Sequence, residues 1–99
     1  MAWKIELAAE AEAELESAVA WYSNRSPRTA LRFLDAVQCV LEELAFSPDR
    51  WAILIGDVRR AIVPRFPWIV VYRIGESTVT IVAFSHGKRR PQYWAGRLE

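Results

Sequence analysis

The sequence has few of the residues that form covalent, metal or redox sites. Its 99 residues include one cysteine, Cys39, and one histidine, His86. A single cysteine cannot form an internal disulfide, so we expect a reducing, cytoplasmic location and interpret Cys39 as a helix-packing residue. No spacing of cysteine and histidine resembles a zinc site. We expect neither a metal nor another cofactor.

Long hydrophobic runs and glycine-rich loops are also absent. No run approaches the roughly 20 apolar residues of a membrane-spanning helix, and the residues after Met1 do not have the pattern of a signal peptide. The glycines form no loop that could cradle a phosphate. Because 53% of the residues are hydrophobic and 25% are charged, the composition is that of a globular protein. We expect one domain over residues 1–99 and no membrane partner.

The two halves of the chain carry opposite net charge. Residues 1–49 contain four basic and nine acidic residues, whereas residues 50–99 contain nine basic and three acidic residues. Clustered basic residues favour a phosphate-bearing partner. The alternative is a solvated basic face with no partner.

The first half predicts a strand followed by a helical hairpin. Residues 3–7 alternate apolar and polar, as in a half-buried strand. Residues 8–22 are rich in Ala, Glu and Leu, with apolar residues at spacings of three and four, which predicts a helix. Ser26 and Pro27 fit the cap and first position of a second helix that continues to about Phe46. Three acids of the first helix are expected to be solvated: Glu10, Glu12 and Glu14.

The second half predicts a three-stranded antiparallel meander. Its strands are expected at residues 58–63, 68–74 and 79–86. Pro64 and Pro67 should limit the first of these to an edge-like position, and residues 49–56 are interpreted as a loop over the core. The resulting fold is α+β, with the order β-α-α-β-β-β and a helical hairpin packed on one face of a small twisted antiparallel sheet.

Strict alternation assigns a side of the sheet to each residue of the last two strands. Arg73 is expected to face away from the helices, where a ligand could lie. On the last strand, Val79, Ile81, Ala83 and Ser85 are expected on that same side, and Thr80, Val82 and Phe84 on the other. The side of His86 is left open. Basic residues of the sheet could then converge with those of the C-terminal segment, namely Arg59 or Arg60, Arg65 and Arg73 with Lys88, Arg89 and Arg90.

These residue types suit phosphodiester chemistry without a metal. Ribonucleotide cleavage needs a base, an acid and cations for the charge that develops at phosphorus. Histidine is the natural acid or base near neutral pH, which makes His86 the candidate. Arg89 and either Arg59 or Arg60 could offer forked donors to a phosphate, and Tyr93 could donate to or stack on an unpaired base. A lone histidine at a strand end is, however, more often structural.

Several motifs occur together along the chain: Ala20-Trp21-Tyr22, Arg65-Phe66-Pro67-Trp68, Val71-Tyr72-Arg73 and His86-Gly87-Lys88-Arg89-Arg90-Pro91-Gln92-Tyr93-Trp94. With them the sequence resembles toxins of the RelE/ParE superfamily, the toxic half of type II toxin–antitoxin pairs. The resemblance covers nearly the whole chain and implies the fold described above. It also implies a cognate antitoxin protein as partner. Some of Trp3, Trp21, Trp51 and Trp94 are expected on a surface that this partner covers.

The resemblance implies one of two targets. RelE-like members cleave messenger RNA on the ribosome without a metal, whereas ParE-like members are similar in fold but inhibit DNA gyrase. Arg89 stands where the ribonuclease branch has an arginine, and His86 and Tyr93 resemble acid/base residues of some of its members. Two features depart from that branch: Ile69 stands in place of an arginine, and Arg59 and Arg60 in place of lysines.

We predict a metal-independent endoribonuclease that acts on translated mRNA. The predicted catalytic residues are His86, Arg89, Tyr93 and Arg60. The predicted nucleic-acid-binding residues are Arg59, Arg65, Arg73, Lys88 and Arg90. Gyrase inhibition by binding is the alternative, and nucleic-acid binding without toxicity is a third hypothesis.

Overall fold

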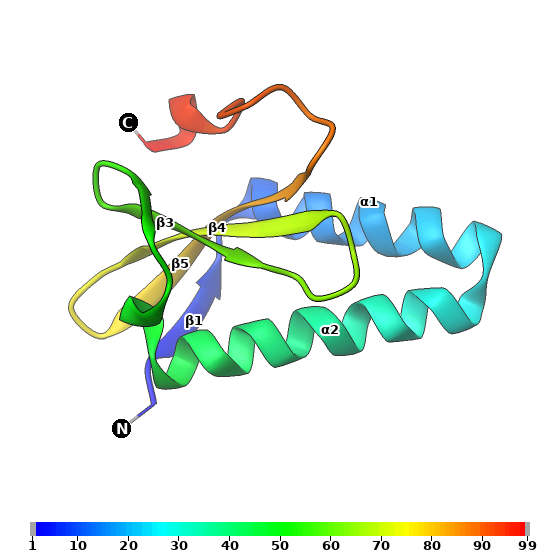
Figure 1. Cartoon of the computed structure of the whole chain (residues 1–99), viewed down its shortest axis with the longest axis horizontal. Helices are drawn as coiled ribbons and strands as arrows, with labels where there is room; N and C mark the ends of the chain where they lie inside the picture. The colour runs from blue at the N-terminus through cyan, green and yellow to red at the C-terminus, as the bar shows by residue number, and fades with distance from the viewer. Residues whose placement is uncertain (1, 99) are drawn as a thin grey trace.

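Two helices cover one face of a five-stranded sheet in the computed structural model, which describes residues 2–98 (Figure 1). The strands are β1 (Lys4–Leu7), β2 (Ile53–Ile55), β3 (Val58–Ile62), β4 (Trp68–Ile74) and β5 (Thr78–His86). The helices are α1 (Ala9–Arg25) and α2 (Pro27–Phe46), and two short 3₁₀ turns are η1 (Pro48–Arg50) and η2 (Ala95–Leu98). This architecture confirms the predicted α+β fold class.

The sheet is mixed rather than wholly antiparallel. Its strand order is β1-β5-β4-β3-β2, and β1 runs parallel to β5 while the other neighbours are antiparallel. Parallel strands need a long crossover, and here the helical hairpin is part of the connection between β1 and β5. The hairpin thus forms part of the crossover that joins the edge strand β1 to the rest of the sheet, and it packs on one face of that sheet.

The segment after α2 differs from the prediction. Ile53–Ile55 was expected within a loop, but it forms a short edge strand that pairs with β3. Strand β3 consequently lies between β2 and β4, so the expected edge-like position is wrong. Pro64 and Pro67 do not interfere because both follow the last residue of β3, Ile62.

The helical hairpin has the predicted boundary. Ser26 caps α2 by accepting a hydrogen bond at Oγ from the Thr29 N–H (3.2 Å), and Pro27 occupies the first turn. The Ser26 N–H also donates to the Tyr22 carbonyl at the end of α1 (2.7 Å). One residue thus ends one helix and begins the next. Neither α1 nor α2 combines the length and the apolar character that a membrane crossing requires.

The main core lies between the helices and the sheet. Its buried members are Ala11, Ala18, Phe33, Val37, Val40 and Leu44 from the helices, with Ala61, Val63, Val70, Tyr72, Val79, Ile81 and Phe84 from the sheet segments. Tyr22, Phe33, Phe66 and Trp68 form an aromatic cluster at one end. The Tyr72 hydroxyl donates to the Pro48 carbonyl (2.6 Å), which fixes the chain beyond α2 against β4.

The C-terminal segment, residues 87–98, covers the opposite face of the sheet; we call it the tail (Figure 1). Trp94 is 1% exposed and packs with Val58, Val71, Val82 and Ala83. The face away from the helices, expected to be open to a ligand, is therefore largely closed by this indole. Trp21, at 51% exposure, remains at the surface as the sequence suggested.

A bulge in β5 overturns the strict alternation predicted for that strand. Tyr72 pairs with Ile81 and Val71 pairs with Ala83, so Val82 is an extra residue. Val82 and Ala83 both pack in the cluster around Trp94, whereas Phe84 returns to the helix side. The predicted side is therefore wrong for Val79 and Ile81, which pack in the core beside the helices, and for Val82, but it is right for Ala83 and Phe84. At the end of the strand, Ser85 borders the cleft between the tail and the sheet, whereas His86 borders both this cleft and a second one beside α1.

Candidate functional site

His86 lies where β5 passes into the tail. The Lys88 N–H donates to His86 Nδ1 (3.0 Å) and the Arg89 N–H donates to the His86 carbonyl (3.0 Å), which closes a tight turn. The imidazole stands edge-on to the Trp68 indole, with ring centroids 5.1 Å apart. Trp68 is itself held by a hydrogen bond from Nε1 to the Tyr22 hydroxyl (3.0 Å). The histidine is half-buried and its orientation is set by neighbours on both sides.

Three of the four residues predicted to be catalytic line one cleft. Arg60, His86 and Arg89 border a cavity of about 260 Å³ between the tail and the sheet, together with Ser85 and Gln92. A second cavity of about 230 Å³ lies on the α1 side, and His86 and Arg89 border this one too. The two residues therefore stand at the junction of both clefts, where a bound group could contact either.

Tyr93, the fourth predicted catalytic residue, is engaged elsewhere. Its hydroxyl donates to Glu14 Oε2 and lies 3.3 Å from the Phe84 carbonyl oxygen. Burial and the Glu14 carboxylate raise the pKa of Tyr93 to about 12. The Arg89 guanidinium stacks over the tyrosine ring at 3.7 Å. Tyr93 thus supports Arg89, and its hydroxyl is committed to Glu14.

Glu14 and Arg97 are the residues that the sequence interpretation missed. Glu14 was expected to be solvated with Glu10 and Glu12, but its side chain is only 14% exposed. Arg97 donates to both of its oxygens, at 2.8 and 3.2 Å, and this hydrogen bonding raises the pKa of Arg97. A signal was present: Glu14 follows Ala11 by three residues and precedes Ala18 by four, so it shares the buried helix face.

Of the sheet arginines predicted to converge with the tail cations, Arg60 borders a cleft together with Arg89, whereas the other three lie elsewhere. Arg59 donates to the backbone carbonyls of Asp49 (3.1 Å) and Trp51 (2.6 Å), on the helix side of the sheet. Arg73 pairs with Asp57 at 2.9 Å, which lowers the pKa of that carboxyl, and reaches only the end of the tail, at the Leu98 carbonyl (3.4 Å). Arg65, with a positive φ of 70°, borders a groove along α2.

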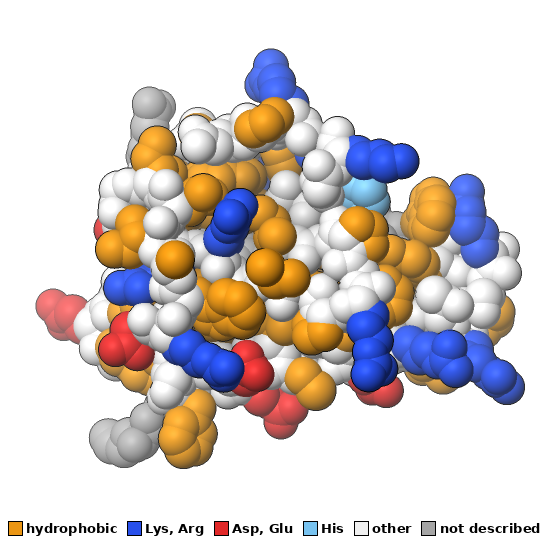
Figure 2. Space-filling model, viewed as in Figure 1, with side chains coloured by type: hydrophobic (Ala, Val, Ile, Leu, Met, Phe, Trp, Pro, Cys, Tyr) orange, Lys and Arg blue, Asp and Glu red, His pale blue; other side chains and the backbone are white. Residues whose placement is uncertain are grey.

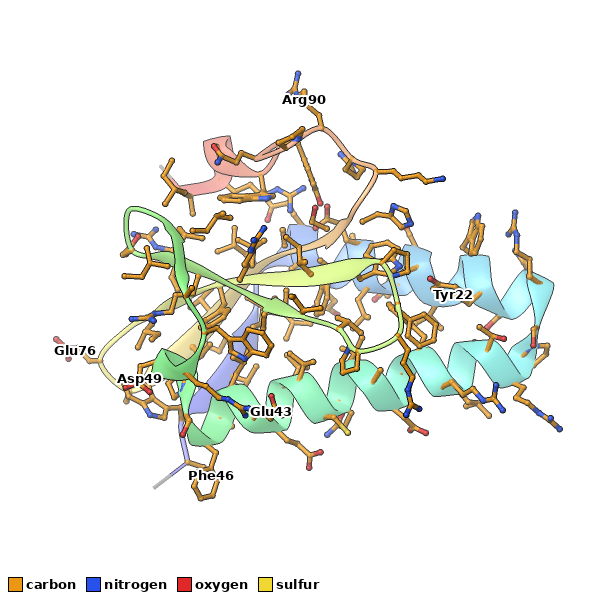
Figure 3. The ribbon with its side chains drawn as sticks, viewed as in Figure 1. Tyr22, Glu43, Phe46, Asp49, Glu76 and Arg90 are labelled. Carbon is orange, nitrogen blue, oxygen red and sulfur yellow. The ribbon has the colours of Figure 1, made fainter. Side chains whose placement is uncertain are left out.

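Lys88, Arg89 and Arg90 are the exposed cations of the tail. Arg90 projects from the outermost bend of the chain, away from the sheet (Figure 3). On the face shown in Figure 2, basic side chains are dispersed among hydrophobic ones and do not merge into one continuous patch. The tail therefore presents three neighbouring cations on a short protruding turn rather than a broad basic surface.

Comparison with known proteins gives a family match over residues 5–91, to the ParE toxin of the type II toxin–antitoxin system parDE. No curated protein sequence matches the chain. Among solved structures, a similar chain comes from one described as the chromosomal ParDE TA system from P. aeruginosa, with a TM-score of 0.74 and 17% identity. The alignment covers 85% of this chain and 95% of the other. At that identity the likeness establishes the fold.

Proposed function

Since the chain belongs to the ParE toxin family of type II toxin–antitoxin systems, we propose that it inhibits DNA gyrase by binding, and that the tail cations Lys88, Arg89 and Arg90 are central to the contact. This was the alternative to ribonuclease activity at the level of the sequence. The family match moves it to first place. ParE-like members of the superfamily act on gyrase, and the match extends through the turn that carries these cations.

The observation that carries the proposal is that three side chains predicted for ribonuclease chemistry, those of Tyr93, Arg59 and Arg73, are engaged in structural contacts. Tyr93 holds its proton against Glu14, Arg59 is bound to two backbone carbonyls, and Arg73 is paired with Asp57. A general acid must release its proton during the reaction, and a pKa of about 12 opposes that for Tyr93. Three exposed cations on a protruding turn are instead suited to docking on an acidic protein surface.

The test is a supercoiling assay with purified gyrase and increasing concentrations of the toxin. Replacing Lys88, Arg89 and Arg90 together by Gln should raise the inhibitory concentration at least about tenfold. The matched control replaces three exposed helix arginines, Arg25, Arg28 and Arg32, by Gln, which removes the same charge elsewhere and should have little effect. Equal losses in the two variants would mean that net charge, not the tail, governs inhibition.

Membership of the family implies an antitoxin partner, and exposed apolar side chains on the helical hairpin support a surface for it. Trp21, Leu31 and Leu34 are 51%, 65% and 38% exposed. Large exposed apolar residues are a common feature of protein interfaces. A bound antitoxin should raise the melting temperature of the toxin, and Trp21→Ala with Leu31→Ala should reduce that shift. Identical melts with and without antitoxin would count against the interaction.

A second candidate function, metal-independent mRNA cleavage, is supported by the cleft that Arg60, His86 and Arg89 share. In this case primer extension on cellular transcripts, shortly after induction, should reveal codon-phased breaks. His86→Ala and Arg89→Ala should abolish the breaks while the proteins remain folded. Intact transcripts in growth-arrested cells would exclude this function and leave gyrase as the target.

A further inference from the structure

The outer edge of β5 continues past the strand that pairs with it. The last hydrogen bond from the β1 side is made by the Ala8 N–H to the Ile81 carbonyl (3.0 Å). Within residues 2–98, no strand pairs with this side of β5 over residues 82–86, which we call the β5 edge. Unpaired backbone groups at a sheet edge require other partners when they are removed from water.

Side chains supply those partners. The Phe84 N–H donates to Glu14 Oε1 (3.2 Å), and the Val82 carbonyl accepts from Arg97 Nη1 (3.2 Å). The Tyr93 hydroxyl lies within hydrogen-bond distance of the Phe84 carbonyl (3.3 Å). One helix residue and two tail residues thus take the place of a neighbouring strand.

Glu14 is the common member of these contacts. Its carboxylate accepts from the backbone of β5, from the Tyr93 hydroxyl and from both terminal nitrogens of Arg97, and Arg89 Nη1 lies 3.9 Å away. Because the Glu14 side chain is only 14% exposed, these interactions occur largely out of water, where charge-assisted hydrogen bonds are strong. Helix α1, β5 and the tail therefore meet at one carboxylate.

We propose that Glu14 is a positioning residue, which fastens the tail to the β5 edge and thereby fixes Lys88, Arg89 and Arg90 in the orientation that contacts the target. The last clause rests on the gyrase-binding function proposed above. Trp94 holds the tail by packing, but Trp94 lies on the other face of the sheet from the helices. Glu14 adds the directional contacts that set the position of Tyr93 and, through its ring, of Arg89.

The first test is hydrogen–deuterium exchange of the purified toxin. In Glu14→Ala, the amides of the β5 edge and of the tail should exchange at least about tenfold faster, with the core of α2 and β4 unchanged. Glu14→Gln retains an acceptor and should lie between Glu14→Ala and the wild type. Glu12→Ala, on the same helix but exposed, is the matched control and should not differ from the wild type. Unchanged exchange of the tail in Glu14→Ala would overturn the proposal.

If Glu14→Ala fails to fold, the contacts of Glu14 can be removed instead by substitutions in the tail. Arg97→Ala and Tyr93→Phe each remove one of the groups that Glu14 binds, and both should mobilise residues 87–98 while Trp94 keeps the tail associated. Unaltered tail exchange in both variants would contradict the positioning role of Glu14.

Inhibition of gyrase separates the structural part of the inference from its functional part. Glu14→Ala should raise the inhibitory concentration about tenfold. Glu14→Gln should raise it less, and Glu12→Ala should match the wild type. A mobile tail with unchanged inhibition would refute a role of Glu14 in target contact. If the wild type itself does not inhibit gyrase while Glu14→Ala mobilises the tail, the proposed function fails and the fastening of the tail by Glu14 stands.

Discussion

The Glu14 carboxylate accepts a hydrogen bond from the Phe84 N–H at 3.2 Å, although the two residues are 70 positions apart in the chain. The contact occurs because β1 ends at Leu7, short of the end of β5. A helix side chain then satisfies a backbone group that a longer strand would have paired. The same carboxylate binds the tail, so the end of β5 and the basic turn are stabilised together.

The cap between the two helices gives a simple test of the hairpin. Ser26→Ala removes the hydroxyl oxygen that accepts from the Thr29 N–H. We expect a loss of about 1 kcal/mol in the free energy of unfolding, measured by urea denaturation. Ser23→Ala, close by in the last turn of α1, is the control and should have a much smaller effect. Equal stability of wild type and Ser26→Ala would show that the cap contributes nothing.

Packing of the tail depends on Trp94. Trp94→Ala should cost about 3–5 kcal/mol, since a fully buried indole is replaced by a cavity against Val71 and Val82. Denaturation followed by tryptophan fluorescence would measure the loss. The control is Trp21→Ala, where about half of the side chain is already exposed and the loss should stay below about 1 kcal/mol. A similar small loss for Trp94 would mean that the tail is not part of the cooperative fold.

The Tyr72 hydroxyl should stabilise the connection between α2 and β2. In Tyr72→Phe the Pro48 carbonyl loses its buried donor, and the expected cost is about 1–2 kcal/mol. Hydrogen–deuterium exchange of the backbone amides should become faster at residues 49–52, next to the lost contact. A neutral substitution without local loosening would show that water replaces the hydroxyl without penalty.

Alkaline pH should weaken the attachment of the tail. The pKa of Tyr93 is raised from 10.0 to about 12 in the folded protein, so its stabilising effect is complete below pH 10 and is lost as the pH rises towards 12. Tyr93→Phe should therefore flatten the decline of unfolding free energy over this range. Some decline should remain, because burial also raises the pKa of Tyr72. Parallel pH profiles of wild type and Tyr93→Phe would contradict this assignment.

Local patterns were sufficient to predict most of the fold. The helices follow from the spacing of their apolar residues and from the Ser26-Pro27 boundary, both of which are short-range signals. Strand β2 was missed because Ile53–Ile55 is a three-residue apolar run without alternation, and its pairing depends on β3. The bulge at Val82 was missed for a related reason: it is a property of the register between β4 and β5, which neither strand determines alone.

The candidate site was less predictable than the fold. His86, Arg60 and Arg89, which were predicted to act together, all border one cleft. The role of Glu14 depends on Phe84, Tyr93 and Arg97, whose approach follows only from the path of the tail. Ionic residues near one another in sequence suggested a solvated helix face, and the long-range partners that bury Glu14 were not visible in that pattern.

The most direct test of the account is inhibition of purified DNA gyrase in a supercoiling assay. Wild-type toxin should inhibit, the Lys88/Arg89/Arg90→Gln variant should require at least about tenfold more protein, and the Arg25/Arg28/Arg32→Gln control should behave as wild type. Two results would contradict the claim that the tail of this ParE-family toxin binds gyrase. One is undiminished inhibition by the tail variant, and the other is no inhibition by the wild type at any concentration of purified toxin.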